Sequence, residues 1–161
     1  MQAAIHHITP PKGSAASPGE VVQVVFRQYD PKGDRGVVLA PWVRQIRAMK
    51  PFDKMDSTDF QRHKDRVIEP LIERCTPVVA AHPDASDQVF GWVCGAMDGQ
   101  DQVLHFIYVR GAFRRFGIGT ALMKTQFPGL GTRPLYYTHR TAAMKHFADR
   151  WNARWDPYRA S

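Results

Sequence analysis

The residues best suited to chemistry lie in one short segment, Arg114-Arg115-Phe116-Gly117-Ile118-Gly119. It follows an apolar run and opens a stretch with helical periodicity. A helix start exposes unpaired backbone N–H groups and the positive end of the helix dipole. Two glycines spaced i, i+2 let a large anion approach the backbone, and arginines before them add charge-assisted hydrogen bonds to phosphate oxygens. The segment therefore predicts a diphosphate-binding turn.

The distribution of charge favours an anionic ligand for this part of the chain. Between residues 102 and 148 there is no Asp or Glu, whereas seven Lys and Arg residues lie there. Outside that stretch, fifteen basic residues balance fifteen acidic ones, so the whole net charge of +7 belongs to it. A polyanionic ligand explains this excess. A solvated basic face or a general affinity for nucleic acid explains it equally, and charge alone does not choose among the three.

The spacing of the glycines excludes the two commonest phosphate-binding loops. A Walker A loop requires G-x-x-x-x-G-K-[ST], which is missing. The dinucleotide-binding fingerprint requires G-x-G-x-x-G, and Gly111 lies too far upstream of Gly117 to supply it.

The overall composition, 43% apolar and 23% charged, is that of an ordinary soluble globular protein. No apolar run is long enough to cross a bilayer, and the first twenty residues lack the apolar stretch of a secretory signal, so we expect a cytoplasmic protein without a membrane association. Cys75 and Cys94 indicate neither a disulfide framework nor a zinc site. His139 and His146 have no third ligand in the pattern, so no metal is expected.

The pattern of apolar residues predicts one mixed α/β domain over residues 21–161, after a flexible leader over residues 1–20 that is rich in Pro, Gly, Ser and Ala. Asp56 or Ser57 is expected to cap the second helix and Thr141 the last one, and bends are expected at Pro41 and Pro70. The predicted strands are 21–27, 76–81, 89–97, 103–109 and 135–138, with a short stand-in for a final strand at 155–158, and the predicted helices are 35–49, 57–75, 117–126 and 141–151.

The segment from Ile107 to Met123, IYVRGAFRRFGIGTALM, resembles the acyl-CoA-binding motif of the GNAT N-acetyltransferase superfamily. That motif is a strand ending in hydrophobic-x-Val, a short loop, and [RQ]-x-x-G-x-[GA] opening a helix. A looser resemblance extends from Val21 to Trp151. It implies a mixed sheet of about six strands flanked by helices, with an acyl-CoA cleft where the central strand splays from the strand at 135–138.

The resemblance also implies acetyl-CoA as co-substrate and a set of residues that bind it. The backbone of Ile107 and Val109 would bind the pantetheine and the acyl carbonyl, and the N–H groups of residues 115–120 would bind the pyrophosphate. The full expected set is Ile107, Tyr108, Val109, Arg114, Arg115, Phe116, Gly117, Ile118, Gly119, Thr120 and Thr141.

The catalytic residues of the family are not where the family keeps them. Relatives commonly place a glutamate base on the central strand or its neighbour, whereas here the titratable residues of that strand are His105 and Tyr108. Relatives also place a tyrosine acid on the last helix, and Ala148 occupies that position. Thr141 or Arg140 replaces the asparagine that usually precedes this helix.

Substitutes for the missing acid and base are available nearby. His105 and Tyr137 are the expected catalytic pair, with Tyr136 and His139 as further candidates for the acid. A histidine in an apolar strand is more often a hydrogen-bonded core residue, and a strand tyrosine more often packs, so both alternatives stay open.

Three functions are compatible with the sequence. The first is transfer of an acetyl group from acetyl-CoA to a primary amine of a small molecule or a protein. The second keeps acyl-CoA binding without turnover, as a ligand-binding or partner-binding module. The third is nucleic-acid binding through the basic stretch, with stacking on Phe113, Phe116, Tyr136 and Tyr137. It ranks last because those aromatic positions follow the periodicity of a core.

Overall fold

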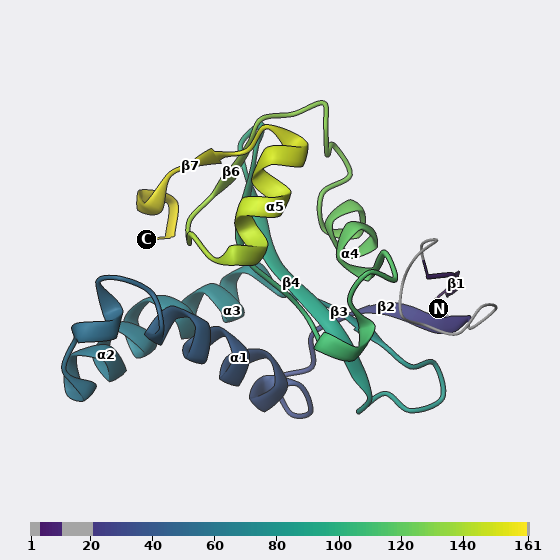
Figure 1. Ribbon diagram of the computed structural model, residues 1–161, viewed down its shortest axis with the longest axis horizontal. Helices are drawn as coiled ribbons and strands as arrows, with labels where there is room; N and C mark the ends of the chain where they lie inside the picture. The colour runs from purple at the N-terminus through teal and green to yellow at the C-terminus, as the bar shows by residue number, and fades with distance from the viewer. Residues whose placement is uncertain (1–3, 11–20, 161) are drawn as a thin grey trace.

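The fold is a mixed sheet of seven strands covered by helices on both faces (Figure 1). The computed structural model describes residues 4–10 and 21–160. Neighbouring strands from β1 to β5 pair antiparallel, whereas β5–β6 and β6–β7 pair parallel. The strands follow chain order and are β1 (Ile5–Ile8), β2 (Val22–Gln28), β3 (Val78–Ala81), β4 (Val89–Asp98), β5 (Asp101–Val109), β6 (Leu135–Tyr137) and β7 (Arg154–Trp155). The predicted fold class is confirmed, with seven strands where about six were expected.

The helices form two layers, with α1 to α3 on one face of the sheet and α4 and α5 on the other (Figure 1). Among the described residues, no helix has the length and apolar character needed to cross a bilayer. The helices are α1 (Arg35–Arg47), α2 (Ser57–His63), α3 (Glu69–Cys75), α4 (Ile118–Gln126) and α5 (Ala142–Trp151), with a π-helical turn at Lys64–Ile68 and 3-10 turns at Phe52–Lys54, Gly111–Phe113 and Pro157–Ala160.

Several local features differ from the sequence expectation. Residues 5–8 of the expected leader form β1, which pairs with β2, while residues 1–3 and 11–20 lie outside the described residues. Pro41 lies inside the continuous helix α1. Pro70 lies in the first turn of α3, where its missing N–H costs nothing, and the irregularity expected there takes the form of the π-helical turn just before it.

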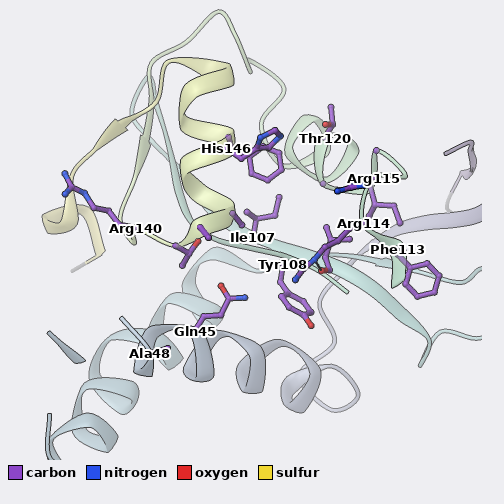
Figure 2. Close-up of a pocket in the computed structure, with 18 of the residues that line it drawn as sticks. Gln45, Ala48, Ile107, Tyr108, Phe113, Arg114, Arg115, Thr120, Arg140 and His146 are labelled. Atoms are coloured by element: carbon purple, nitrogen blue, oxygen red, sulfur yellow. Dashed lines mark hydrogen bonds between the residues drawn. The ribbon is translucent and has the colours of Figure 1, made fainter. Parts of the chain in front are cut away.

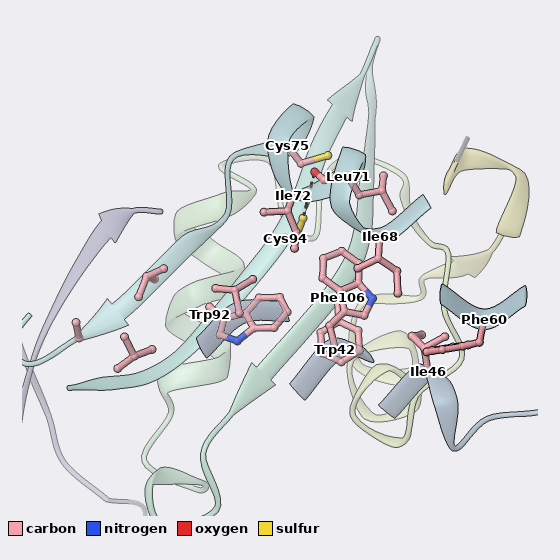
Figure 3. Packing of buried hydrophobic residues seen from close by; sticks show 14 residues of the cluster. Trp42, Ile46, Phe60, Ile68, Leu71, Ile72, Cys75, Trp92, Cys94 and Phe106 are labelled. Carbon is pink, nitrogen blue, oxygen red and sulfur yellow. Dashed lines mark hydrogen bonds between the residues drawn. The ribbon is translucent and has the colours of Figure 1, made fainter. Parts of the chain in front are cut away.

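The core on the α1–α3 face is built around stacked aromatic rings (Figure 3). The ring centroids of Trp42 and Trp92 lie 5.1 Å and 5.2 Å, respectively, from that of Phe106. All three side chains are fully buried. Burying each of them stabilises the fold by about 1.5–3 kcal/mol, and offset ring packing adds to this. This cluster holds α1 against β4 and β5, which fixes the helix that will form one end of the site.

The start of α1 is held to β2 by a buried ion pair. Asp34 precedes the helix and accepts hydrogen bonds from both terminal nitrogens of Arg27, one at 2.8 Å, and from the backbone N–H of Asp30. Burial raises the pKa of Asp34, but these three hydrogen bonds outweigh it and the net pKa is lowered. The carboxylate therefore stays charged and keeps the β2–α1 connection in one conformation.

The C-terminal turn is tied across the sheet by Arg159. Its guanidinium donates to Asp98 and Asp101 of the β4–β5 hairpin and to Asp156. The same group lies 3.9 Å from the ring centroid of Tyr136 in β6. The last segment of the chain thus links β6 to the hairpin at which β5 begins.

Candidate functional site

The site begins at a β-bulge in β5. Opposite β4, Phe106 pairs with Cys94 and Leu104 pairs with Gly95, which leaves His105 as one extra residue. In such a bulge, the alternation of side chains and of backbone N–H and C=O groups along the strand shifts by one residue.

The bulge determines which backbone groups of β5 face away from β4. Before it, the N–H of Gln102 and the C=O of Leu104 bond toward β6, to Pro134 and Thr138. After it, the N–H of Arg110 bonds toward β4, to Phe90. Since successive residues alternate, the N–H and C=O groups of residues 107 and 109 point toward the β6 side.

Beyond the bulge, β6 no longer follows β5. The last paired residues are Leu104 and Tyr137, and the last backbone hydrogen bond runs from the N–H of Thr138 to the C=O of Leu104 at 3.1 Å. β5 continues to Val109, whereas the chain after β6 turns away and leads into α5. The strands therefore splay, as expected from the sequence, and the backbone of Ile107 and Val109 faces the gap.

The turn before α4 has an unusual backbone. Arg115 and Gly117 both adopt a left-handed conformation, with φ of 70° and 79°. Left-handed residues within such a turn direct successive N–H groups toward one point, which makes an anion-binding concavity. Gly119 allows close packing for another reason, because a Cβ there would lie 2.9 Å from the tip of the Phe147 ring of α5, which would have to shift. The predicted diphosphate-binding turn thus has the necessary shape.

A cavity of about 630 Å³ joins these features (Figure 2). It runs from the first turn of α4, through the gap between β5 and α5, to the last turns of α1. Three arginines and one histidine line it, and none of its described lining residues is acidic. The lining residues are Gln45, Ala48, Met49, Ile107, Tyr108, Val109, Phe113, Arg114, Arg115, Gly117, Ile118, Gly119, Thr120, Arg140, Thr141, Ala142, Ala143, His146 and Phe147.

Ten of the eleven residues expected to bind the cofactor line this cavity, and the exception is Phe116. Its side chain is 7% exposed and packs in the core on the α4 face. Thr141 lines the cavity and also caps α5, since its hydroxyl accepts a hydrogen bond from the N–H of Met144 at 3.2 Å, as predicted. The Nε of Arg114 donates to the C=O of Val109 at 3.1 Å, which links the turn to β5.

Neither expected catalytic side chain lines the cavity. The bulge directs His105 to the face that carries Phe106, where the imidazole is 2% exposed. Tyr137 packs against the α5 side of the core. Their catalytic roles stay predictions that the cavity geometry does not favour.

Sequence reasoning missed several residues of the cavity wall. Gln45 lies in α1, and Ala48 and Met49 follow directly after its end, some sixty residues before the motif. His146 and Phe147 lie in α5. No local spacing distinguishes these positions from the rest of their helices.

A buried polar network lies where the strands splay. The hydroxyl of Thr138 is 3.1 Å from Nδ1 of His105 and 2.8 Å from Nδ1 of His139, and Nδ1 of His139 is 3.2 Å from the C=O of His105. Burial, with a smaller contribution from the charge of His105, lowers the pKa of His139 to about 4. The His139 imidazole is therefore neutral at physiological pH.

The side chains of the two cysteines lie on the α1–α3 face of the sheet (Figure 3), and neither lines the cavity. Both are buried free thiols, and the thiol of Cys94 donates to the C=O of Leu71 at 3.8 Å. Burial raises the pKa of Cys94, whereas interaction with Cys94 and then with His105 lowers that of Cys75 to about 5. No cluster of three or more metal-ligating side chains occurs in the part of the chain that is described.

Comparison with known proteins agrees with this geometry. The model of the acetyltransferase (GNAT) family matches residues 43–126, slightly more than half of the chain. The chain belongs to the GNAT acetyltransferase family. The match begins within α1 and ends with α4, so it includes β5 and the turn before α4. No curated protein matches the chain.

Solved structures of similar shape include other members of this class. A proposed GNAT-family acetyltransferase from Desulfovibrio desulfuricans is 20% identical with a TM-score of 0.48, covering 79% of this chain and 82% of that one. A proposed acetyltransferase from Deinococcus radiodurans is 20% identical with a TM-score of 0.42, covering 80% of each chain. An integron cassette protein from V. cholerae is 16% identical with a TM-score of 0.45, covering 79% and 83%.

The left-handed turn before α4 makes a prediction about stability. Gly117→Ala should lower the free energy of unfolding by about 1–2 kcal/mol, because an alanine Cβ is strained at φ 79°. The matched control is Gly111→Ala, where φ is ordinary and a Cβ meets no atom within 4 Å. Urea denaturation of both variants checks this, and equal stabilities would contradict it.

The buried His139 makes a prediction about pH. Its pKa is about 4 in the folded protein and about 6.5 in the unfolded chain, so only the unfolded chain gains this proton as pH falls below 6.5. Neutral His139 therefore contributes fully to the free energy of unfolding above pH 6.5. Roughly 3 kcal/mol of that free energy is lost between pH 6.5 and 4. Denaturation at several pH values should show a steeper loss for the wild type than for His139→Asn, and parallel curves would contradict the assignment.

Proposed function

We propose that this chain transfers an acetyl group from acetyl-CoA to an amine. The observation that carries the proposal is the cavity itself, which joins the left-handed turn before α4 to a gap between two splayed strands. A nucleotide thioester needs one site for its phosphates and another, some distance away, for its acyl group. Few other ligands require both features in one elongated cavity.

The phosphate end has three sources of positive potential. The turn and the first residues of α4 line the cavity, so the unpaired N–H groups of the helix start and the helix dipole would contribute there. Arg114 and Arg115 add two guanidinium groups at the same end (Figure 2). Charge-assisted hydrogen bonds from these groups would hold a diphosphate.

The acyl end would lie between Ile107 and Val109 of β5 and the start of α5. The N–H groups that face this gap have no strand partner, so they are free to donate to the pantetheine and to the oxygen of the acyl group. In the transition state that oxygen becomes an oxyanion, and a fixed backbone N–H stabilises it without reorganisation. The bulge thus supports both binding and chemistry.

The acceptor would enter from the α1 side. Gln45, Ala48 and Met49 line that end of the cavity, on the face of the sheet opposite to α4. The cavity therefore reaches both layers of helices, and the two substrates would approach through opposite ends. This arrangement supports direct transfer between them without a covalent enzyme intermediate.

Tyr108 is the candidate proton carrier. Of the titratable side chains in the wall, Tyr108 projects toward α1 and Gln45 (Figure 2), whereas His146 belongs to α5. The amine nitrogen bonds to the carbonyl carbon, the C–S bond breaks, and the proton lost by the amine ends on the coenzyme A thiol. A phenol near the α1 end is in position to carry that proton.

An acyl-CoA-binding module without turnover is the second candidate. It is favoured by the composition of the wall, which in the described residues has no carboxylate to remove a proton from an ammonium group. Amines of pKa near 10 are almost entirely protonated at neutral pH. Binding and turnover are therefore measured separately below.

The first experiment tests ligand binding. Acetyl-CoA at about one hundred times its dissociation constant should stabilise the protein by about 2.7 kcal/mol, measured by thermal denaturation. Arg115→Glu should weaken binding about ten- to a hundredfold, because a charge-assisted contact becomes repulsive. Arg133→Glu is the matched control, since this exposed arginine belongs to the same basic stretch and does not line the cavity. Equal weakening by both variants, or no stabilisation by acetyl-CoA, would refute the phosphate site.

The second experiment tests transfer. Release of free thiol from acetyl-CoA is followed over a panel of amines with Tyr108→Phe, which keeps the aromatic ring and removes the hydroxyl. We expect kcat to fall about a hundredfold or more with little change in acetyl-CoA affinity. Tyr137→Phe is the control, because Tyr137 lies outside the cavity. A large loss in Tyr137→Phe alone would reverse the roles, and stabilisation by acetyl-CoA without thiol release on any amine would favour the binding module.

A further inference from the structure

The splay between β5 and β6 leaves one buried carbonyl without a strand partner. β6 stops pairing at Leu104, and the next carbonyl of β5, that of His105, lies at the bulge. A buried C=O without a donor destabilises the fold. Nδ1 of His139 lies 3.2 Å from this oxygen. A side chain from the segment after β6 therefore supplies the hydrogen-bond donor that a neighbouring strand would otherwise provide.

The proton positions follow from the need to satisfy every group. The hydroxyl of Thr138 has one proton to donate, and it lies between Nδ1 of His105 and Nδ1 of His139. If the hydroxyl donated to His139, the C=O of His105 would lose its imidazole donor. If it donates to His105, then His139 carries its proton on Nδ1 and shares it between the Thr138 oxygen at 2.8 Å and the C=O of His105 at 3.2 Å. This second arrangement gives every member of the network a partner.

The network lies at the closed end of the gap, next to the backbone groups that face it. All three side chains are buried, with 2% exposed for His105, 4% for Thr138 and 7% for His139. In β5, His105 is followed two residues later by Ile107. In the segment after β6, the C=O of His139 accepts a hydrogen bond from the N–H of Thr141, which caps α5. The ring of Trp42 packs edge-on against the imidazole at 6.0 Å and closes the network from the α1 side.

We propose that His139 is a positioning residue for acyl-CoA, which through its Nδ1–H fixes the separation of β5 from α5 and so the aim of the Ile107 and Val109 N–H groups. The proposal rests on the function proposed above. It assigns His139 no contact with either substrate and no proton transfer to them. Its effect passes through the carbonyl of His105 to the backbone two and four residues further along.

The chemistry of the imidazole supplies a sharp test. The amide nitrogen of asparagine occupies nearly the same place as Nδ1 of histidine, whereas that of glutamine corresponds to Nε2. His139→Asn therefore retains the donor to the His105 carbonyl, and His139→Gln removes it while keeping a polar side chain of similar size. A role in packing alone would rank the variants by size, with glutamine the better substitute.

The first readout is ligand binding and turnover, with acetyl-CoA as the probe. His139→Gln should raise the dissociation constant and KM for acetyl-CoA about tenfold, whereas His139→Asn should stay close to the wild type. Glutamine binding as tightly as the wild type, or asparagine as weak as glutamine, would overturn the proposal. If His139→Gln does not fold, His139→Leu replaces it, because leucine is close to asparagine in size and has no hydrogen-bond donor. Equal affinities of His139→Asn and His139→Leu for acetyl-CoA would then overturn the proposal.

The second readout needs no ligand. In the free protein, the amide chemical shifts of Ile107 and Val109 should move in His139→Gln and stay in place in His139→Asn, measured by NMR. Unchanged shifts in the glutamine variant would contradict the positioning role even if acetyl-CoA binds. Shifts that move as expected in a protein that does not bind acetyl-CoA would contradict the proposed function and leave the positioning of these groups intact, so the two failures are distinguishable.

Discussion

One extra residue in β5 is the constraint on which the site depends. The bulge at His105 reverses the alternation of the strand, so that residues 107 and 109 aim their N–H and C=O groups away from β4. At the same point β6 departs, and those groups meet a gap instead of a neighbouring strand. In a regular strand these groups would point toward β4 and form hydrogen bonds within the sheet. The cavity and its free donors thus have a single structural cause.

The sequence predicted the turn before α4 because that turn is local. Its arginines, glycines and following helix lie within a few residues, and the conformations of Arg115 and Gly117 follow from the same short segment. The run VLHFIYV likewise predicted a strand buried on both faces. The bulge within it was invisible, since every residue of that run also suits a regular strand. The assignment of His105 to catalysis depended on that missing information.

Residues remote from the motif could be predicted only in part. Gln45 lies in α1 and Met49 just beyond its end. Whether these side chains meet the core or an opening depends on two strands that lie much later in the chain. β1 was missed for a different reason, because IHHI is short and is flanked by residues typical of loops. Such segments acquire their conformation from the partner strand rather than from their own propensity.

The tie made by Arg159 has a consequence for the kinetics of ligand entry. One wall of the cavity belongs to α5 and the residue before it, which follow β6 in the chain. Arg159 connects β6 to the β4–β5 hairpin, and its guanidinium covers the ring of Tyr136. With the walls held apart in the free protein, a ligand would order few residues on arrival, so little conformational entropy would be lost on binding. Entry would then be limited by diffusion and by steering of a polyanion toward a cationic mouth, and the association rate would fall steeply as ionic strength rises.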